Sequence, residues 1–69
     1  MKTNVPIIRE LREERVRRGI TQQALAAPAG VSVCVISMWE RGAHYPSLEN
    51  FEAVVNALGG TLKIDWGQR

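Results

Sequence analysis

The chain has 69 residues and a mass of 7.7 kDa, which is the size of one small domain and excludes a large enzyme with a deep cleft. Its 45% hydrophobic content is enough for a packed core, and its formal net charge of +2 permits a polyanionic partner without requiring one. One cysteine excludes an internal disulfide framework, and no signal peptide or membrane span is visible. We therefore expect a mostly helical, cytoplasmic protein that does not contact a membrane.

The first predicted helix covers residues 6–18. Apolar side chains recur there near helical spacing, Pro6 suits a first turn, and Gly19 is well placed to end the helix. The remaining positions mix arginine with glutamate, a pattern typical of a solvated surface.

Three further helix starts share one pattern, in which Thr21, Ser32 and Ser47 can each act as the N-cap. An apolar pair flanks each cap and can make contact across the first turn: Ile20 with Leu25, Val31 with Ile36, and Pro46 with Phe51. Glycines follow at the positions where these helices are expected to end. The predicted helices therefore cover 22–28, 33–41 and 48–58.

Residues 61–66 alternate polar and apolar side chains, which predicts a β-strand with Leu62, Ile64 and Trp66 on one face. No second segment alternates in this way, so the strand needs a partner from outside the monomer. We expect it to pair antiparallel with the same segment of a second copy, with these three side chains as dimer contacts. A frayed tail is the alternative. The chain thus divides into residues 1–60 and a C-terminal tail, 61–69.

The segment from Thr21 to Gly42 has the features that two steeply crossing helices need. Ala26 is small enough for close contact between helices, and Gly30 suits a tight turn. Apolar side chains can anchor the second helix from below: Leu25, Val31, Val35, Ile36 and Trp39.

This segment closely resembles the Cro/repressor-type (xenobiotic-response-element) helix-turn-helix family. The matching residues are TQQALA at 21–26, AGVS at 29–32, IS at 36–37, WERG at 39–42 and PSL at 46–48. The resemblance extends from Leu11 to Leu58. It implies a compact, all-α, five-helix DNA-binding domain, to which the C-terminal strand would be added. In such a domain the second helix crosses the phosphate backbone and the third lies in the major groove.

The resemblance also implies roles for individual residues. Double-stranded DNA would be contacted from the second helix, the third helix and the following loop, by Gln22, Ser32, Val33, Cys34, Ser37, Met38, Arg41, His44 and Ser47. Arg15 and Glu40 would form a salt bridge between the first and third helices. We expect no catalytic residue, metal or cofactor, because the single histidine lies in a predicted turn without other ligands near it.

Two features depart from the family pattern. Val33, Cys34 and Met38 are apolar where polar or basic side chains usually read base edges, and Pro28 is expected to end or kink the second helix. The apolar side chains leave an alternative function open, in which the helix-turn-helix is a protein interaction module with weak or no DNA binding.

We expect a sequence-specific transcriptional regulator, with repression as its mode, that binds a two-fold symmetric operator as a homodimer and is not an enzyme. A phage-type repressor and an antitoxin with a toxin protein partner both fit this description. The sequence does not choose between them, and it specifies neither the operator nor an effector.

Overall fold

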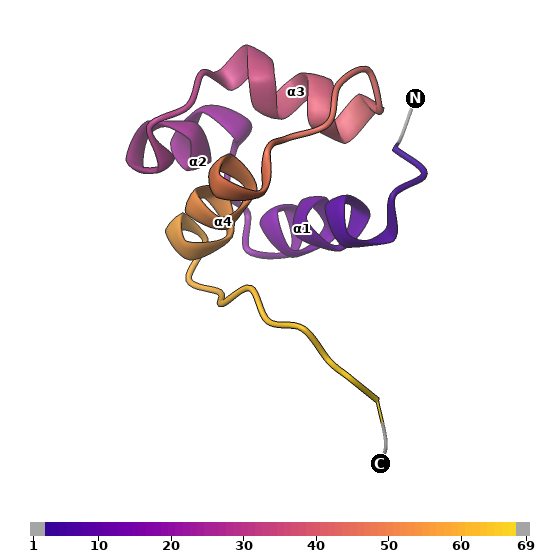
Figure 1. The fold of residues 1–69 in the computed structure, drawn as a ribbon. Coiled ribbons are helices and arrows are strands. Elements are labelled where there is room, and N and C mark those ends of the chain that lie inside the picture. The colour runs from indigo at the N-terminus through magenta and orange to yellow at the C-terminus, as the bar shows by residue number, and fades with distance from the viewer. Residues whose placement is uncertain (1–2, 68–69) are drawn as a thin grey trace.

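The polypeptide forms four α-helices in a computed structural model that describes residues 3–67 (Figure 1). The helices are α1 (Pro6–Arg17), α2 (Gln22–Ala29), α3 (Val33–Arg41) and α4 (Leu48–Ala57). Their bounds agree to within one residue with the ranges predicted from sequence. The all-α class is therefore confirmed. None of these helices has the length and hydrophobicity needed to cross a membrane.

Three of the helices begin after a residue whose side chain caps the first turn, as predicted. The Thr21 hydroxyl oxygen accepts a hydrogen bond from the Ala24 N–H at 3.0 Å, and Ser32 and Ser47 accept equivalent bonds at 3.1 Å. Each bond satisfies one of the backbone donors that lack a partner in a first helical turn. The start of α1 is different, because Val5 makes no side-chain cap and Pro6 fixes the backbone of the first turn.

The connection between α2 and α3 is a single tight turn. Gly30 has a φ of +75°, in the left-handed region that glycine adopts without steric cost. Ala26 is buried on α2, and its small side chain suits a close approach between helices. The two features predicted for a steep crossing are thus present.

The core is formed by buried apolar side chains from all four helices. Its members are Ile8, Leu11, Leu25, Ala26, Ile36, Trp39, Phe51, Val54 and Leu58. The Trp39 and Phe51 rings lie with their centroids 6.5 Å apart in a tilted arrangement. Burying one such large apolar side chain contributes about 1.5–3 kcal/mol relative to leaving it exposed, so this cluster holds α3 against the rest of the domain.

The prediction of a fifth helix is wrong for the described residues. After α4, Gly59 turns the backbone with a φ of +94°, and the segment that follows leaves the helical body as an extended trace (Figure 1). The β-branched and alternating residues at 61–66 favour this extended form over a helix.

The predicted C-terminal strand is also not seen within residues 3–67. The backbone of 61–66 makes no hydrogen bond in this part of the chain, so the segment is extended without a ladder. Leu62 packs against the edge of the core, whereas Ile64 and Trp66 are each 72% exposed. A single chain lacks the partner that a strand requires.

The sequence predicts that Pro28 ends or kinks α2, and the first of these two predictions is wrong, because the helix continues to Ala29. Proline cannot donate a backbone hydrogen bond to the carbonyl four residues earlier, which here belongs to Ala24. Ala24 is exposed, so water can satisfy its carbonyl and the helix tolerates the proline in its last turn.

The buried and exposed sides of α3 give a direct test of this packing. We expect Ile36→Val to lower the free energy of unfolding by about 0.5–1.5 kcal/mol, because Ile36 is fully buried and its loss leaves a small cavity. Val33→Ala removes more atoms from the exposed side and is expected to cost less. Urea unfolding followed by circular dichroism measures both, and a larger loss for Val33→Ala would contradict the assigned orientation of α3.

Candidate nucleic-acid interface

The outward side of α3 carries the residues predicted to contact DNA. Val33 and Cys34 are exposed in the first turn, Ser37 and Met38 are half-buried one turn later, and Arg41 is exposed at the end. This spacing of three and four residues places the five side chains on one face of the helix. Ile36, Trp39 and Glu40 are buried on the other side. The structure therefore presents these predicted residues together on one accessible surface.

This surface has few groups that can read bases by hydrogen bonding. Arg41 carries the fork of donors that matches a guanine edge, and Ser37 offers one hydroxyl. Val33, which is 41% exposed, and Met38 are suited to contact with thymine methyl groups. The chemistry of α3 thus combines one strong donor with apolar contacts.

Exposed polar groups at the ends of the neighbouring helices extend this surface. Ser32 at the start of α3 and Ser47 at the start of α4 are exposed, and so is His44 in the loop between them. The serine oxygens accept hydrogen bonds as caps, which leaves each hydroxyl hydrogen free to donate to a phosphate. Backbone N–H groups in a first helical turn are also suited to an anion.

Gln22, which the family resemblance places among the DNA contacts, also has a partner within the protein. Its side chain is half-buried, and Nε2 donates a hydrogen bond to Oε1 of Glu40 at 2.9 Å. The start of α2 is thereby tied to α3. This long-range contact joins residues 18 positions apart and has no signal in the local sequence.

Glu40 is the centre of a buried ionic network, and the predicted salt bridge to Arg15 is confirmed. Arg15 donates from Nε to Oε2 at 2.8 Å and from Nη2 to Oε1 at 2.9 Å, while its Nη1 donates to the Ile20 carbonyl at 2.7 Å. Arg12 lies farther away, with Nε 3.8 Å from Oε1. The Glu40 side chain is only 4% exposed, so these partners replace the water that it loses.

The N-terminal segment supports the end of α3, a role that the sequence did not suggest. Thr3 is buried, and its backbone N–H donates to the Glu40 carbonyl at 2.9 Å. Gly42 follows with a φ of +80°, and a Cβ at that position would lie 3.2 Å from the Thr3 Cα. Glycine therefore provides both the turn and the space for Thr3.

The charges around α2 and α3 favour an anionic partner. Between Thr21 and Ser47 the only carboxylate is Glu40, which is buried and neutralised by Arg15. Arg41 is exposed in the same segment. This segment consequently combines an exposed arginine with a carboxylate that is buried.

An exposed ionic cluster lies instead at the end of α1. Glu14 accepts hydrogen bonds from Arg17 and Arg18, and these two partners, Arg17 first, lower the pKa of the Glu14 carboxyl. The same contact with Glu14 raises the pKa of Arg17. Both groups are open to solvent, so the pair is weaker than its short distances suggest.

We expect Glu40→Gln to lower the free energy of unfolding by about 3–5 kcal/mol, because it removes the charge that compensates the buried Arg15 guanidinium. Glu14→Gln is the matched control on an exposed pair and should have a far smaller effect. Urea unfolding of both variants gives the comparison. Equal losses of stability would show that the buried network does not hold α1 to α3.

Comparisons with known proteins agree with this geometry. The helix-turn-helix family model matches residues 8–64. The restriction-modification controller protein C.AhdI from Aeromonas hydrophila is 32% identical, with a TM-score of 0.72 over 77% of this chain and 80% of that chain. The clp gene regulator ClgR from C. glutamicum is 34% identical, with a TM-score of 0.73 over 80% of this chain and 70% of that chain. Curated protein sequences yielded no significant match. The chain belongs to the Cro/repressor-type helix-turn-helix family of DNA-binding transcription regulators.

Proposed function

We propose that this protein is a sequence-specific transcriptional repressor that inserts α3 into the major groove of a two-fold symmetric operator and binds it as a homodimer. The observation that carries the proposal is the exposed face of α3, which ends in Arg41, while the one acidic residue of the helix, Glu40, is buried on the other side. Ser32, His44 and Ser47 lie at positions suited to the adjacent phosphates, where they would fix the register of α3 on the duplex.

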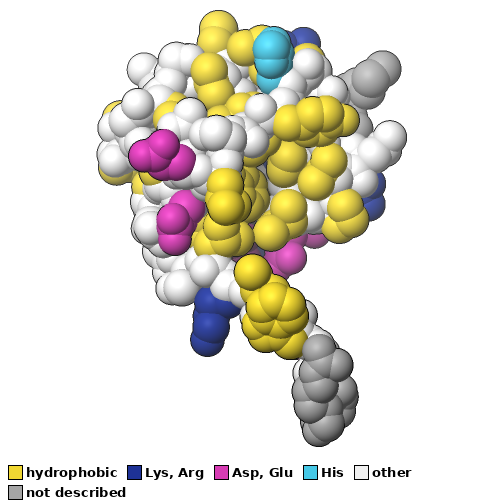
Figure 2. All heavy atoms as spheres, in the orientation of Figure 1, with side chains coloured by type: hydrophobic (Ala, Val, Ile, Leu, Met, Phe, Trp, Pro, Cys, Tyr) yellow, Lys and Arg dark blue, Asp and Glu magenta, His cyan; other side chains and the backbone are white. Residues whose placement is uncertain are grey.

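The proposed dimer is held by the C-terminal tail. Ile64 and Trp66 are large apolar side chains that are largely exposed in the single chain, and Figure 2 shows hydrophobic side chains of the tail standing out from the helical body. Such exposure is costly unless a partner covers these side chains. Pairing of two tails would cover them and would satisfy the free backbone groups of residues 61–66. The two half-sites would then lie about one helical turn apart, near 34 Å.

A protein interaction module is the second candidate function. The observation in its favour is the exposure of Val33 and Cys34, two apolar side chains at the start of α3. A partner protein could cover them through a largely apolar interface. The two settings considered for a regulator, a phage-type switch and an antitoxin with its toxin, remain equally compatible with this surface.

Selection of an operator from random DNA distinguishes the two candidate functions. Binding to a pool of random duplexes is expected to enrich two-fold symmetric sequences, with an affinity that falls steeply as salt rises because counterions are released from DNA. Arg41→Ala should then weaken binding to the enriched duplex by about 1–3 kcal/mol, roughly 5- to 150-fold, as measured by fluorescence anisotropy.

Arg17→Ala is the control for that measurement, because Arg17 is an exposed arginine on α1 outside the α2–α3 surface. Equal losses for the two variants would contradict base reading by Arg41. Binding that does not change with salt, or a failure to enrich any duplex at low salt, would favour the protein interaction module.

Truncation tests the dimer. A chain that ends at Gly60 should be monomeric by analytical ultracentrifugation, and it should bind the enriched operator much more weakly than the intact chain. The physical reason is that linking two half-site contacts raises affinity without any new contact to bases. An unchanged dimer after truncation would show that the tail does not hold the two copies together.

A further inference from the structure

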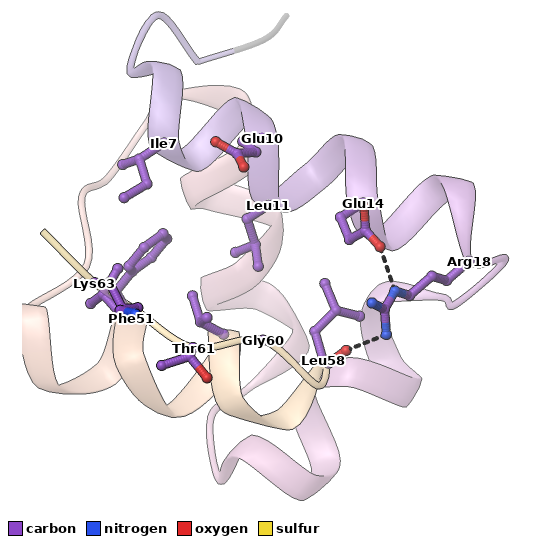
Figure 3. A pocket seen from close by; sticks show the side chains of 12 residues that line it. Ile7, Glu10, Leu11, Glu14, Arg18, Phe51, Leu58, Gly60, Thr61 and Lys63 are labelled. Atoms are coloured by element: carbon purple, nitrogen blue, oxygen red, sulfur yellow. Dashed lines mark hydrogen bonds and ion pairs between the residues drawn. The ribbon is translucent and has the colours of Figure 1, made fainter. Parts of the chain in front are cut away.

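A cavity of about 380 Å³ lies between α1, α4 and the first residues of the tail (Figure 3). Ile7, Leu11, Phe51 and Leu58 line it, and Figure 3 shows these side chains around a common space. Leu62 is the last apolar side chain of the tail on its wall. We call this space the α1/α4 cavity. α3 contributes no residue to it, so filling it leaves the DNA-contacting face free.

The tail has a self-complementary pattern about Ile64. In an antiparallel pair of tails with the two-fold axis at Ile64, this residue faces its own copy, and Lys63 faces Asp65 of the partner. The same register places Leu62 opposite Trp66 of the partner. Opposite charges and large apolar side chains stabilise such directly facing positions, and symmetry makes each unlike pair occur twice.

Neighbouring registers lack this complementarity. An axis at Lys63 or at Asp65 would place two like charges directly opposite each other, which is destabilising. An axis between residues would place Ile64 opposite a charged side chain and would turn apolar side chains toward the wrong face. The register centred on Ile64 is therefore favoured by both charge and burial.

This register brings an aromatic side chain to the cavity. Facing residues of paired strands project to the same side, so the partner's Trp66 lies beside Leu62 at the cavity wall. We propose that Trp66 of each copy fills the α1/α4 cavity of the other copy, in a reciprocal exchange. This inference rests on the dimer proposed above and adds its register and the surface that receives each tail.

The cavity also offers a polar partner for the indole. Glu10 lies on its wall in Figure 3, and it forms no ion pair within the part of the chain that the structure describes. A buried indole N–H usually requires an acceptor, and the Glu10 carboxylate can accept its hydrogen bond. The apolar walls would contact the indole ring, while the Glu10 carboxylate would accept the hydrogen bond from the indole N–H.

Lys63 and Asp65 allow a test, in the full-length chain, of the register in which the two tails pair. Lys63→Asp and Asp65→Lys each place like charges in facing positions, and each should raise the dimer dissociation constant about tenfold at low salt. The double variant Lys63→Asp/Asp65→Lys restores the opposite charges and should dimerise like the original protein. Sedimentation equilibrium measures all four proteins, and circular dichroism confirms that their helices are intact.

Trp66 fluorescence in the same samples tests occupation of the cavity. We expect its emission to shift to shorter wavelength and its quenching by acrylamide to fall as the concentration passes through the dimerisation range. Trp66→Phe, in which Trp39 is the remaining tryptophan, should show no such change.

Different results would overturn different parts of this scheme. A dimer that is equally stable in both single charge variants, or one that the double variant fails to restore, would overturn the register. Trp66 emission that does not change on dimerisation would overturn filling of the cavity. These results leave the proposed dimer intact. The dimer itself would be overturned if the chain without substitutions stays monomeric at every concentration and on the operator.

Discussion

The position of α3 depends on one buried carboxylate. Glu40 accepts hydrogen bonds from Arg15 on α1 and from Gln22 on α2, and its own backbone carbonyl accepts from the Thr3 N–H. A carboxylate with so little exposure is stable only while these donors are in place. The orientations of α1, α2 and α3 therefore depend on this carboxylate, and the backbone carbonyl of the same residue holds the N-terminal segment, so any tilt of α3 would break several bonds together.

This network adds an acidic residue to the buried side of α3, beside Ile36 and Trp39. The helix buries its one acidic residue and exposes Val33 and Cys34, while Arg41 remains at the surface. Burying Glu40 removes a negative charge from the side that would face phosphates, and pairing it with Arg15 satisfies the group that has been buried. Structural support and electrostatic suitability for DNA consequently come from the same residue.

The parts of the fold that residue patterns predicted without the family resemblance are those encoded locally. Thr21, Ser32 and Ser47 cap helices through bonds to residues three positions away, and for this reason the helix starts could be predicted well. The roles of Gln22 and Thr3 depend on contacts with Glu40 from distant parts of the chain, which no local pattern reveals. The expected fifth helix came from the family resemblance, and the alternating residues after Gly60 oppose it.

A recognition surface with few base-reading groups makes the second copy important for function. One exposed arginine and a set of apolar contacts give each α3 limited discrimination, whereas two linked half-sites combine their free energies and require both sequences at a fixed spacing. Under the proposed dimer, specificity would thus depend on the tail as much as on α3, although the two lie in different parts of the molecule (Figure 1). The side chains that hold the copies together, Ile64 and Trp66, would then set how well DNA is recognised without touching it.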